Sequence, residues 1–252
     1  MTLGRVISSQ ASQEWLEGST TTVVDSLGNQ VVTQAFFMGC ALGDGCLRRD
    51  KRFGTVTLYI SRCQRQAPYA QWQLARLNQE LGTAASLRSF MDKGKYPAVR
   101  FGVSSKRHLA PVYDVLYPNG VKRFTPQAFS DLGPEALALL WMDDGSLEVR
   151  RRQRPRSIKV ERSGWLPVSK DEEEVDVVAS WIHDVTGASG SVVRHKGGML
   201  YLRWFTKQFR LLVGAITEYI HPCLAYKVDL SRTGTVAQWL SESQHLLAGS
   251  GR

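Results

Sequence analysis

Two aspartates in matching surroundings are the residues best placed to do chemistry. Asp44 and Asp144 each follow a run of apolar residues that predicts a helix, and each precedes a glycine. A glycine after the carboxylate predicts a left-handed turn that ends the helix, so each aspartate is expected at a helix C-terminus. A carboxylate there lies beside the negative end of the helix dipole, which costs up to about 1 kcal/mol unless a cation compensates.

Packing the two helices side by side would bring the two carboxylates together, where like charges repel. A bridging divalent cation would remove that repulsion, and hard oxygen ligands favour Mg²⁺ over Zn²⁺. A carboxylate pair with Mg²⁺ can activate water for phosphodiester hydrolysis. Gly39 and Gly43 on the first helix would permit a close approach of the helices. One Asp-Gly pair is usually only a turn, but two copies in equivalent places favour a functional role.

The charge balance indicates a polyanionic partner. The 252 residues include 32 Lys and Arg against 23 Asp and Glu, a net charge of +9, and the pI is about 9.6. Such a balance is typical of proteins that bind nucleic acid or an acidic membrane surface. The four cysteines form no CxxC pair, so neither a zinc site nor a disulfide framework is indicated. No apolar run is long enough to span a bilayer, so the sequence predicts an intracellular protein.

Two basic stretches favour nucleic acid over a membrane. Residues 48–65 contain six basic residues and one acid, and residues 150–162 contain seven and one. Each stretch leads into a segment in which apolar and polar residues alternate, as Val56, Leu58 and Ile60 do, which predicts a strand with one polar face. A two-stranded ribbon fits the DNA major groove, whereas a membrane-binding helix would need apolar residues at helical spacing. A solvated loop is the alternative interpretation of each stretch.

The chain repeats its elements with a period slightly above 100 residues, so that Arg100 matches Arg203 and Lys122 matches Lys227. The first half predicts helices at 33–44, 68–81 and 106–116 and strands at 56–61, 86–91 and 98–103. The second half predicts helices at 133–144, 170–185 and 208–219 and strands at 157–161, 190–194 and 199–205. The expected fold class is therefore α+β in two pseudo-symmetric halves. Such halves would suit the local twofold symmetry of DNA, although a duplication kept only for stability is the alternative.

The two aspartate segments resemble the motif of the LAGLIDADG homing endonucleases, specifically the single-chain type with two motifs. Residues 39–45, GCALGDG, and 139–145, LLWMDDG, are similar to degenerate copies of that motif. The resemblance implies two αββαββα halves that form a saddle of antiparallel sheets around two central LAGLIDADG helices. It divides the chain into an N-terminal extension (1–33), a first half (34–125), a second half (126–230) and a tail (231–252). Residues 21–32 in the extension predict a hairpin.

The resemblance also implies a metal site. Asp44 and Asp144 would hold two or more Mg²⁺ ions, for which Mn²⁺ would substitute, and Gly43 and Asp143 are the neighbouring candidates for metal contact. Because the first motif has glycine where the second has Asp143, only one acid per motif is shared. A structural role at the helix end is therefore the favoured interpretation of Asp143.

A lysine near the end of each half would lie in the active-site pocket of such an enzyme. Lys227 matches that place well, within Pro222-Cys-Leu-Ala-Tyr-Lys227. In the first half Lys122 and Arg123 compete for the role, and Lys122 is favoured. The candidate catalytic residues are thus Asp44, Asp144, Lys122 and Lys227.

The resemblance implies a Mg²⁺-dependent endonuclease that cuts both strands of a long asymmetric DNA target and promotes mobility of its host intron or element. Double-stranded DNA is the expected partner, intron RNA is a second candidate, no membrane partner is expected, and the single chain predicts a monomer. The protein would act wherever its DNA resides, in an organelle matrix or a bacterial or phage-infected cytoplasm. The alternative is an RNA maturase or a non-cleaving DNA-binding regulator on the same scaffold.

The candidates for DNA contact are polar or basic residues of the predicted sheet faces, of which about half are expected to touch only phosphate or solvent. They are Arg48, Arg52, Thr57, Tyr59, Arg62, Arg100, Arg150, Arg152, Lys159, Arg194, Lys196, Tyr201 and Arg203.

Overall fold

The computed structural model describes residues 23–24, 30–31, 34–154 and 157–233. The chain separates into two compact units, Met1–Thr33 and Gln34–Arg252, and each is considered by itself. In the smaller unit β1 (Val23–Val24) and β2 (Gln30–Val31) pair antiparallel, as a hairpin over residues 21–32 requires. Among the described residues no helix combines the length and apolar character that crossing a membrane would need. The division of the larger unit after residue 125 stays a prediction.

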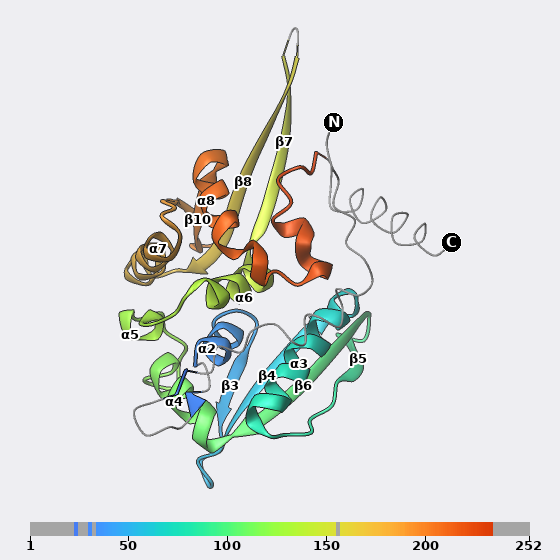
Figure 1. The fold of residues 1–252 in the computed structure, drawn as a ribbon, viewed down its shortest axis with the longest axis vertical. Helices are drawn as coiled ribbons and strands as arrows, with labels where there is room; N and C mark the ends of the chain where they lie inside the picture. Colours follow the sequence, from blue (N-terminus) through green and yellow to red (C-terminus); the bar gives the residue numbers. More distant parts are fainter. Residues whose placement is uncertain (1–22, 25–29, 32–33, 155–156, 234–252) are drawn as a thin grey trace, which may run out of the picture. The chain divides into compact units, whose positions relative to one another are not determined.

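The first half of the larger unit has the order helix, strand, strand, helix, strand, strand, helix (Figure 1). The elements are α2 (Gln34–Leu42), β3 (Cys46–Arg49), β4 (Val56–Cys63), α3 (Ala67–Leu81), β5 (Arg88–Asp92), β6 (Tyr96–Ser105) and α4 (Lys106–Leu116), with the short helix η1 (Gln64–Gln66) before α3. Ser105 caps α4 by accepting a hydrogen bond from the backbone N–H of His108 at 3.1 Å, so strand and helix join directly.

The second half repeats this order after the short helix α5 (Pro126–Phe129). Its elements are α6 (Pro134–Asp144), β7 (Ser146–Arg154), β8 (Ser157–Ser169), α7 (Glu172–Thr186), β9 (Ser191–Arg194), β10 (Leu200–Phe205) and α8 (Thr206–Ile216), followed by η2 (Thr217–Tyr219) and η3 (Pro222–Lys227). Asp171 caps α7 by accepting from the N–H of Glu173 at 3.0 Å. The internal repeat expected from the sequence is confirmed at the level of whole elements.

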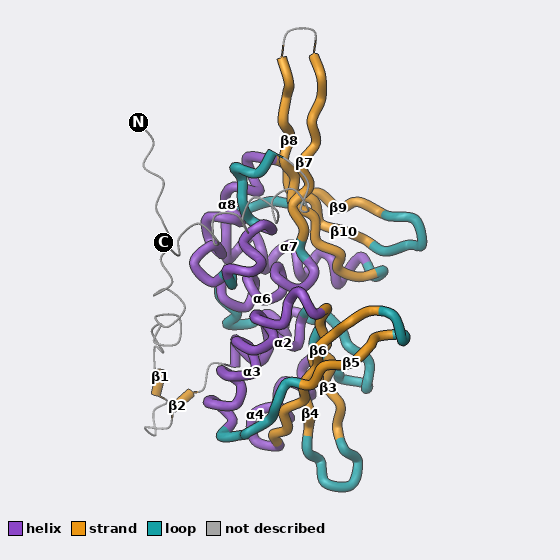
Figure 2. Tube along the Cα trace, turned by 90° about the vertical axis from the view of Figure 1, so that its right-hand side faces the viewer, coloured by secondary structure: helices purple, strands orange, loops and turns teal. Residues whose placement is uncertain are grey.

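The strands form two four-stranded antiparallel sheets of identical topology, β3-β4-β6-β5 and β7-β8-β10-β9. In the larger unit the helices lie on one side of these sheets and leave the other side open (Figure 2). Trp141, Trp181 and Trp204 are at most 5% exposed and fill the apolar layer between helices and sheet. The α+β class agrees with the expectation from the sequence.

The cross-strand register fixes which residues of the two halves are equivalent. Tyr59 faces the first residue of β3 and Gly102 on β6, whereas Trp165 faces the first residue of β7 and Arg203 on β10. Tyr59 is therefore equivalent to Trp165, and Gly102 to Arg203. The sequence match of Arg203 with Arg100 is wrong by two residues. The two arginines are alike in type but lie at different cross-strand positions, since the residue equivalent to Arg203 is Gly102.

The hairpin of β7 and β8 is a large difference between the halves. It has nine ladder pairs where β3 and β4 have four, and it projects beyond the rest of its sheet (Figure 1). The sequence predicted a strand only at 157–161 and named neither β3 nor β7 separately. In β7 three consecutive arginines hide the alternation, and β3 is too short to show one.

The two central helices, α2 and α6, pack closely because the first carries a glycine at the contact. A Cβ on Gly39 would lie 2.7 Å from Leu139 Cδ1 and 3.0 Å from Ala136 Cα. The glycines after the two aspartates are needed for a different reason than expected. Gly145 is extended, with φ −67° and ψ 151°, and a Cβ there would lie 2.6 Å from Trp141 Cε3. The predicted left-handed turn is wrong, and lack of space selects the glycine.

Candidate active site

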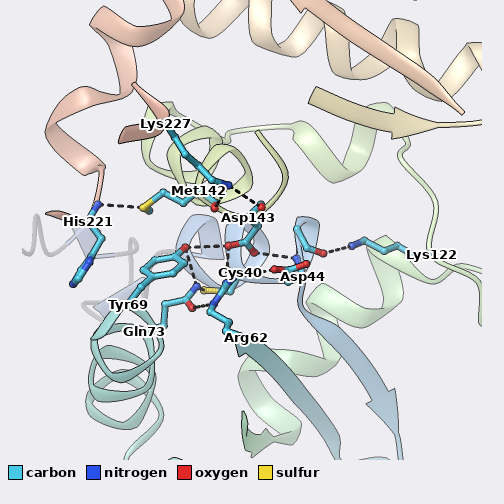
Figure 3. A network of polar contacts seen from close by, with 11 residues as sticks. Cys40, Asp44, Arg62, Tyr69, Gln73, Lys122, Met142, Asp143, His221 and Lys227 are labelled. Carbon is cyan, nitrogen blue, oxygen red and sulfur yellow. Dashed lines mark hydrogen bonds and ion pairs between the residues drawn. The ribbon is translucent and has the colours of Figure 1, made fainter. Parts of the chain in front are cut away.

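Each central helix ends against a lysine from the end of its own half (Figure 3). Lys122 Nζ donates to the carbonyl oxygens of Leu42 and Gly43 at 2.6 and 3.0 Å. Lys227 Nζ donates to the equivalent carbonyl oxygens of α6, again at 2.6 and 3.0 Å. The two ammonium groups therefore offset the negative ends of both helix dipoles. Burial lowers the pKa of both lysines, and the neighbouring aspartates oppose that shift.

Of the two basic candidates in the first half, the structure places Lys122 at the helix end and Arg123 elsewhere. Arg123 forms ion pairs with Asp171 at 2.7 Å and with Glu174 at 2.8 Å, near the start of α7. Its guanidinium thus links the loop before α5 to the start of α7.

Asp143 lies at the centre of a buried polar network (Figure 3). Its Oδ1 accepts from Arg62 Nη2 at 2.6 Å and from the Tyr69 hydroxyl at 3.2 Å, and its Oδ2 accepts from the backbone N–H of Asp44 at 2.9 Å. The side chains of Arg62 and Asp143 are both 0% exposed. Burial raises the pKa of Asp143, and the Arg62 charge opposes that shift. Both carboxylate oxygens accept hydrogen bonds from the protein, which supports the structural role favoured for Asp143.

Arg62 joins this network from β4 and does not lie on the sheet surface, where a DNA contact was expected. Its Nη1 donates to Asp44 Oδ2 at 3.0 Å, its Nε donates to Gln73 Oε1 at 3.0 Å, and its guanidinium lies 4.4 Å from the Tyr69 ring centre. The alternation along β4 explains the burial, because Arg62 shares the parity of Ile60 and the other inward residues. That signal was available in the sequence. Nothing in the sequence of α3 indicated a role for Tyr69 or Gln73.

The two motif aspartates differ in their surroundings. The Asp44 side chain is 44% exposed, whereas Asp144 is half-buried. Burial, together with the negative charges of Asp44 and Asp143, raises the pKa of Asp144 to about 6, against the opposing effect of Lys122 and Lys227. The acids at the two helix ends therefore lie close enough to repel each other, which is the arrangement that a cation stabilises.

The donors at the helix ends are all oxygen atoms. They are the carboxylates of Asp44 and Asp144 and the nearby main-chain carbonyls, of which Gly43 offers only its carbonyl. Such a set fits a hard divalent cation such as Mg²⁺ or Ca²⁺. In the described part of the chain no group of three His, Cys, Asp or Glu side chains would hold a metal. Two carboxylates would thus need main-chain, water or substrate oxygens to complete the coordination.

Comparison with known proteins places this geometry in a family. The sequence profile of the LAGLIDADG DNA endonuclease family matches residues 34–212. The chain belongs to this family. Both central helices, both sheets and the aspartates Asp44 and Asp144 lie within the matched range.

Solved structures share the fold of this LAGLIDADG protein. The homing endonuclease I-WcaI bound to its DNA recognition sequence is 18% identical, with a TM-score of 0.63 over 90% of this chain and 95% of that one. I-SmaMI bound to uncleaved DNA target in the presence of calcium ions is 11% identical, with a TM-score of 0.53 over 85% of this chain and 94% of that one. A curated relative, Protein RecA of Mycobacterium gastri, is 26% identical over 206 residues. That match covers 76% of this chain but 45% of the relative.

The first sheet of the LAGLIDADG protein turns a polar face outward. Arg48, Tyr59 and Arg100 are exposed on it, and Arg52 is exposed in the turn between β3 and β4. Thr57 is half-buried, with its hydroxyl 2.8 Å from that of a neighbouring serine. Arg48 lies over the Tyr59 ring, 5.5 Å from its centre. These five candidates therefore lie on or beside the open face, where the alternation predicted them.

The second sheet presents its candidates in the same way, but acids pair with several of them. Arg150, Lys159 and Arg194 are exposed and form ion pairs with glutamates at 2.8, 2.8 and 2.5 Å. Exposed ion pairs contribute little stability, so these cations remain available to phosphates. Arg203 stacks over the Trp165 ring at 4.4 Å.

The remaining candidates of the second sheet lie near its β9–β10 turn. Lys196 is exposed in that turn, and Tyr201 is half-buried on β10. The ring of Tyr201 lies 4.6 Å from that of His195. The side chain of Arg152 lies outside the described residues.

Proposed function

We propose that this LAGLIDADG protein is a site-specific endonuclease that hydrolyses both strands of double-stranded DNA with a divalent metal ion. One observation carries the proposal: Asp44 and Asp144 lie at the adjoining ends of two packed helices and interact electrostatically, and each helix end binds the ammonium group of a lysine. The similar proteins I-WcaI and I-SmaMI were solved bound to their DNA targets, and family membership supports the same class of partner here.

The chain's own groups would divide the work in the following way. The Asp44 and Asp144 carboxylates would hold the metal ions in two adjoining active sites, one aspartate serving each strand, and bound metal lowers the pKa of water and stabilises charge on the phosphate. Lys122 and Lys227 each hold an ammonium group at a helix end beside the aspartates, where it would balance charge that develops on a scissile phosphate. Their lowered pKa values make proton transfer easier than for an exposed lysine.

The open faces of the two sheets would bind the major groove on either side of the cleaved phosphates. Each sheet offers basic side chains for phosphates together with hydroxyl and aromatic groups for base edges. The long β7–β8 hairpin gives the second half a longer reach, so the target would be asymmetric. We further propose Mg²⁺ as the natural ion, a monomeric enzyme, and mobility of a host intron or element as the outcome of cleavage.

The test is cleavage of a duplex made by joining the host sequences that flank the reading frame, as if the insertion were absent. Wild-type protein with Mg²⁺ is expected to cut both strands, whereas Asp44→Asn and Asp144→Asn are expected to bind the duplex in Ca²⁺ without cutting it in Mg²⁺. Tight binding without cutting by the wild type would overturn the endonuclease proposal in favour of a DNA-binding regulator or an RNA maturase. Loss of binding in both variants would assign the carboxylates a structural role instead.

A further inference from the structure

The network around Arg62 has a counterpart region in the second half that can be located residue by residue. Helices α3 and α7 both contain 15 residues, so their third residues, Tyr69 and Glu174, are equivalent, and so are their seventh residues, Gln73 and Val178. A phenol hydroxyl in the first pair is replaced by a carboxylate, and an amide in the second pair is replaced by an apolar side chain. At these positions the second half thus lacks the hydroxyl and amide that support Arg62.

The strands locate the counterpart of Arg62 itself. Arg62 lies three residues after Tyr59 and is the penultimate residue of β4, while Val168 lies three residues after Trp165 and is the penultimate residue of β8. The first half therefore has a guanidinium where the second half has a short apolar side chain.

The counterpart of the Arg62 position borders a cavity that is partly open to solvent. This cavity has a volume of about 450 Å³, and its lining includes the counterparts Val168, Glu174 and Val178 together with Asp144 and Lys122. Glu174 does not replace the missing guanidinium, because a carboxylate would repel Asp144, and its oxygens instead accept from Ser169, Phe124 and Arg123. Asp144 thus faces a hollow at the position where Asp44 meets Arg62.

The two motif aspartates consequently differ in how firmly they are held. Asp44 is fixed by Arg62 at 3.0 Å and, through its backbone N–H, by Asp143 at 2.9 Å. Among the hydrogen bonds of the described residues, none reaches the Asp144 carboxylate. A carboxylate that is held in one position loses less freedom when it binds its ligand, and reaction rates depend steeply on such orientation.

We propose that the two active sites work at unequal rates, because Arg62 is a positioning residue for Asp44 and the second half has no equivalent. The inference rests on the proposed endonuclease function. One strand would be cut about tenfold or more faster than the other, since small errors in orientation cost up to about a hundredfold in rate. A nicked duplex would therefore accumulate before the double-strand break.

The experiment follows each strand separately, using the joined-flank duplex labelled at the 5′ end of one strand or the other. Wild type is expected to cut the two strands at different rates in Mg²⁺. Arg62→Lys keeps the charge but loses the forked geometry, so it is expected to slow only the faster strand. Arg62→Met with Asp143→Asn removes both buried charges together and is expected to bring the two rates close to equality. Binding of the uncut duplex in Ca²⁺ is expected to stay within about threefold of wild type for each variant, since Arg62 is buried away from the DNA face.

Val168→Arg provides the converse test, because the cavity has room for a guanidinium near Asp144. It is expected to speed the slower strand and leave the faster one unchanged. Equal strand rates in the wild type, or an equal slowing of both strands by an Arg62→Lys protein whose duplex binding in Ca²⁺ shows it to be folded, would overturn the inference while leaving the endonuclease in place. Absence of any cutting by the wild type would overturn the proposed function itself. A general loss of folded protein would lower both strand rates in parallel and leave their ratio unchanged.

Discussion

The buried pair of Arg62 and Asp143 makes a prediction about stability that needs no DNA. Both side chains are fully buried, and their atoms approach to 2.6 Å. Removing one partner of a buried pair leaves the other charge uncompensated, which costs about 3–5 kcal/mol. We therefore expect Arg62→Met to lower the free energy of unfolding by that amount. Asp143→Asn should cost less, about 1–3 kcal/mol, because Arg62 keeps its contacts with Asp44 and Gln73.

The double variant Arg62→Met with Asp143→Asn should be more stable than Arg62→Met alone, since no unpaired charge remains. Urea unfolding of the four proteins measures this double-mutant cycle.

The stability of Arg62→Met is also expected to depend on pH. In Arg62→Met the pKa of Asp143 would rise further above its unfolded value, because burial would act without the opposing Arg62 charge. The folded state would then bind the proton more tightly, so the deficit in the free energy of unfolding relative to wild type would shrink as pH falls. Two results would refute this account of the network. One is that the free-energy losses of the two single variants add exactly in the double variant, and the other is that the stability deficit of Arg62→Met grows as pH falls.

Three further predictions concern packing, proton binding and DNA affinity. Gly39→Ala is expected to lower the free energy of unfolding by about 1–3 kcal/mol, because its Cβ would lie 2.7 Å from a leucine methyl of α6. Gly214→Ala, whose Cβ would meet nothing within 4 Å, should raise the free energy of unfolding by about 0.4–1 kcal/mol in the same urea assay. Burial lowers the pKa of His221 to about 4 from 6.5, so between these pH values only the unfolded chain binds a proton, and the free energy of unfolding falls as pH drops through that range. His221→Gln should make this fall less steep. An unchanged pH profile of the free energy of unfolding would contradict the assignment. Arg150→Ala should reduce the slope of log K against log salt for DNA binding by about 1, and Arg151→Ala, on the opposite face of the same hairpin, should leave it unchanged.

The positions of the helices, and the placement of a lysine at the end of each aspartate-bearing helix, were within reach of the sequence. The apolar runs before Asp44 and Asp144 have a length and composition that favour a buried helix, and the structure forms α2 and α6 there. The lysines at 122 and 227 followed from the family resemblance, and the structure finds both against helix ends.

The buried network was less accessible, because it depends on contacts between residues far apart in the chain. Arg62 was read as part of a basic surface stretch, although its parity within β4 places it inward. Its partners Asp143, Tyr69 and Gln73 come from two different helices, and no local pattern joins them. The length of the β7–β8 hairpin could not be predicted either, since the consecutive arginines of β7 mask the alternation of apolar and polar residues that marks a strand.

The contrast between Gly43 and Asp143 explains why the halves of the site could not remain identical. These equivalent positions face each other where the two helices meet, and a Cβ on Gly43 would lie 2.5 Å from Asp143 Cβ. Two aspartates do not fit there, so one position must be small and the other then carries a single buried acid. One acid requires one cation, and Arg62 supplies it from the first half.

An arginine at position 168 would have Asp144 as its one acid and none at position 43, whereas Arg62 has two, and the second half instead carries a valine there and a cavity beside Asp144. A homodimer could not divide these roles between its halves, whereas a single chain can, because each half has its own sequence. The asymmetry of the active sites therefore follows from one steric conflict at the contact between the helices. Gly43→Ala tests this argument, since its methyl group would displace Asp143 and is expected to disturb Asp44 and Arg62 together. Unfolding and strand-specific cleavage measured on this one variant should then both change, and a change confined to either would show that the contact does not couple them.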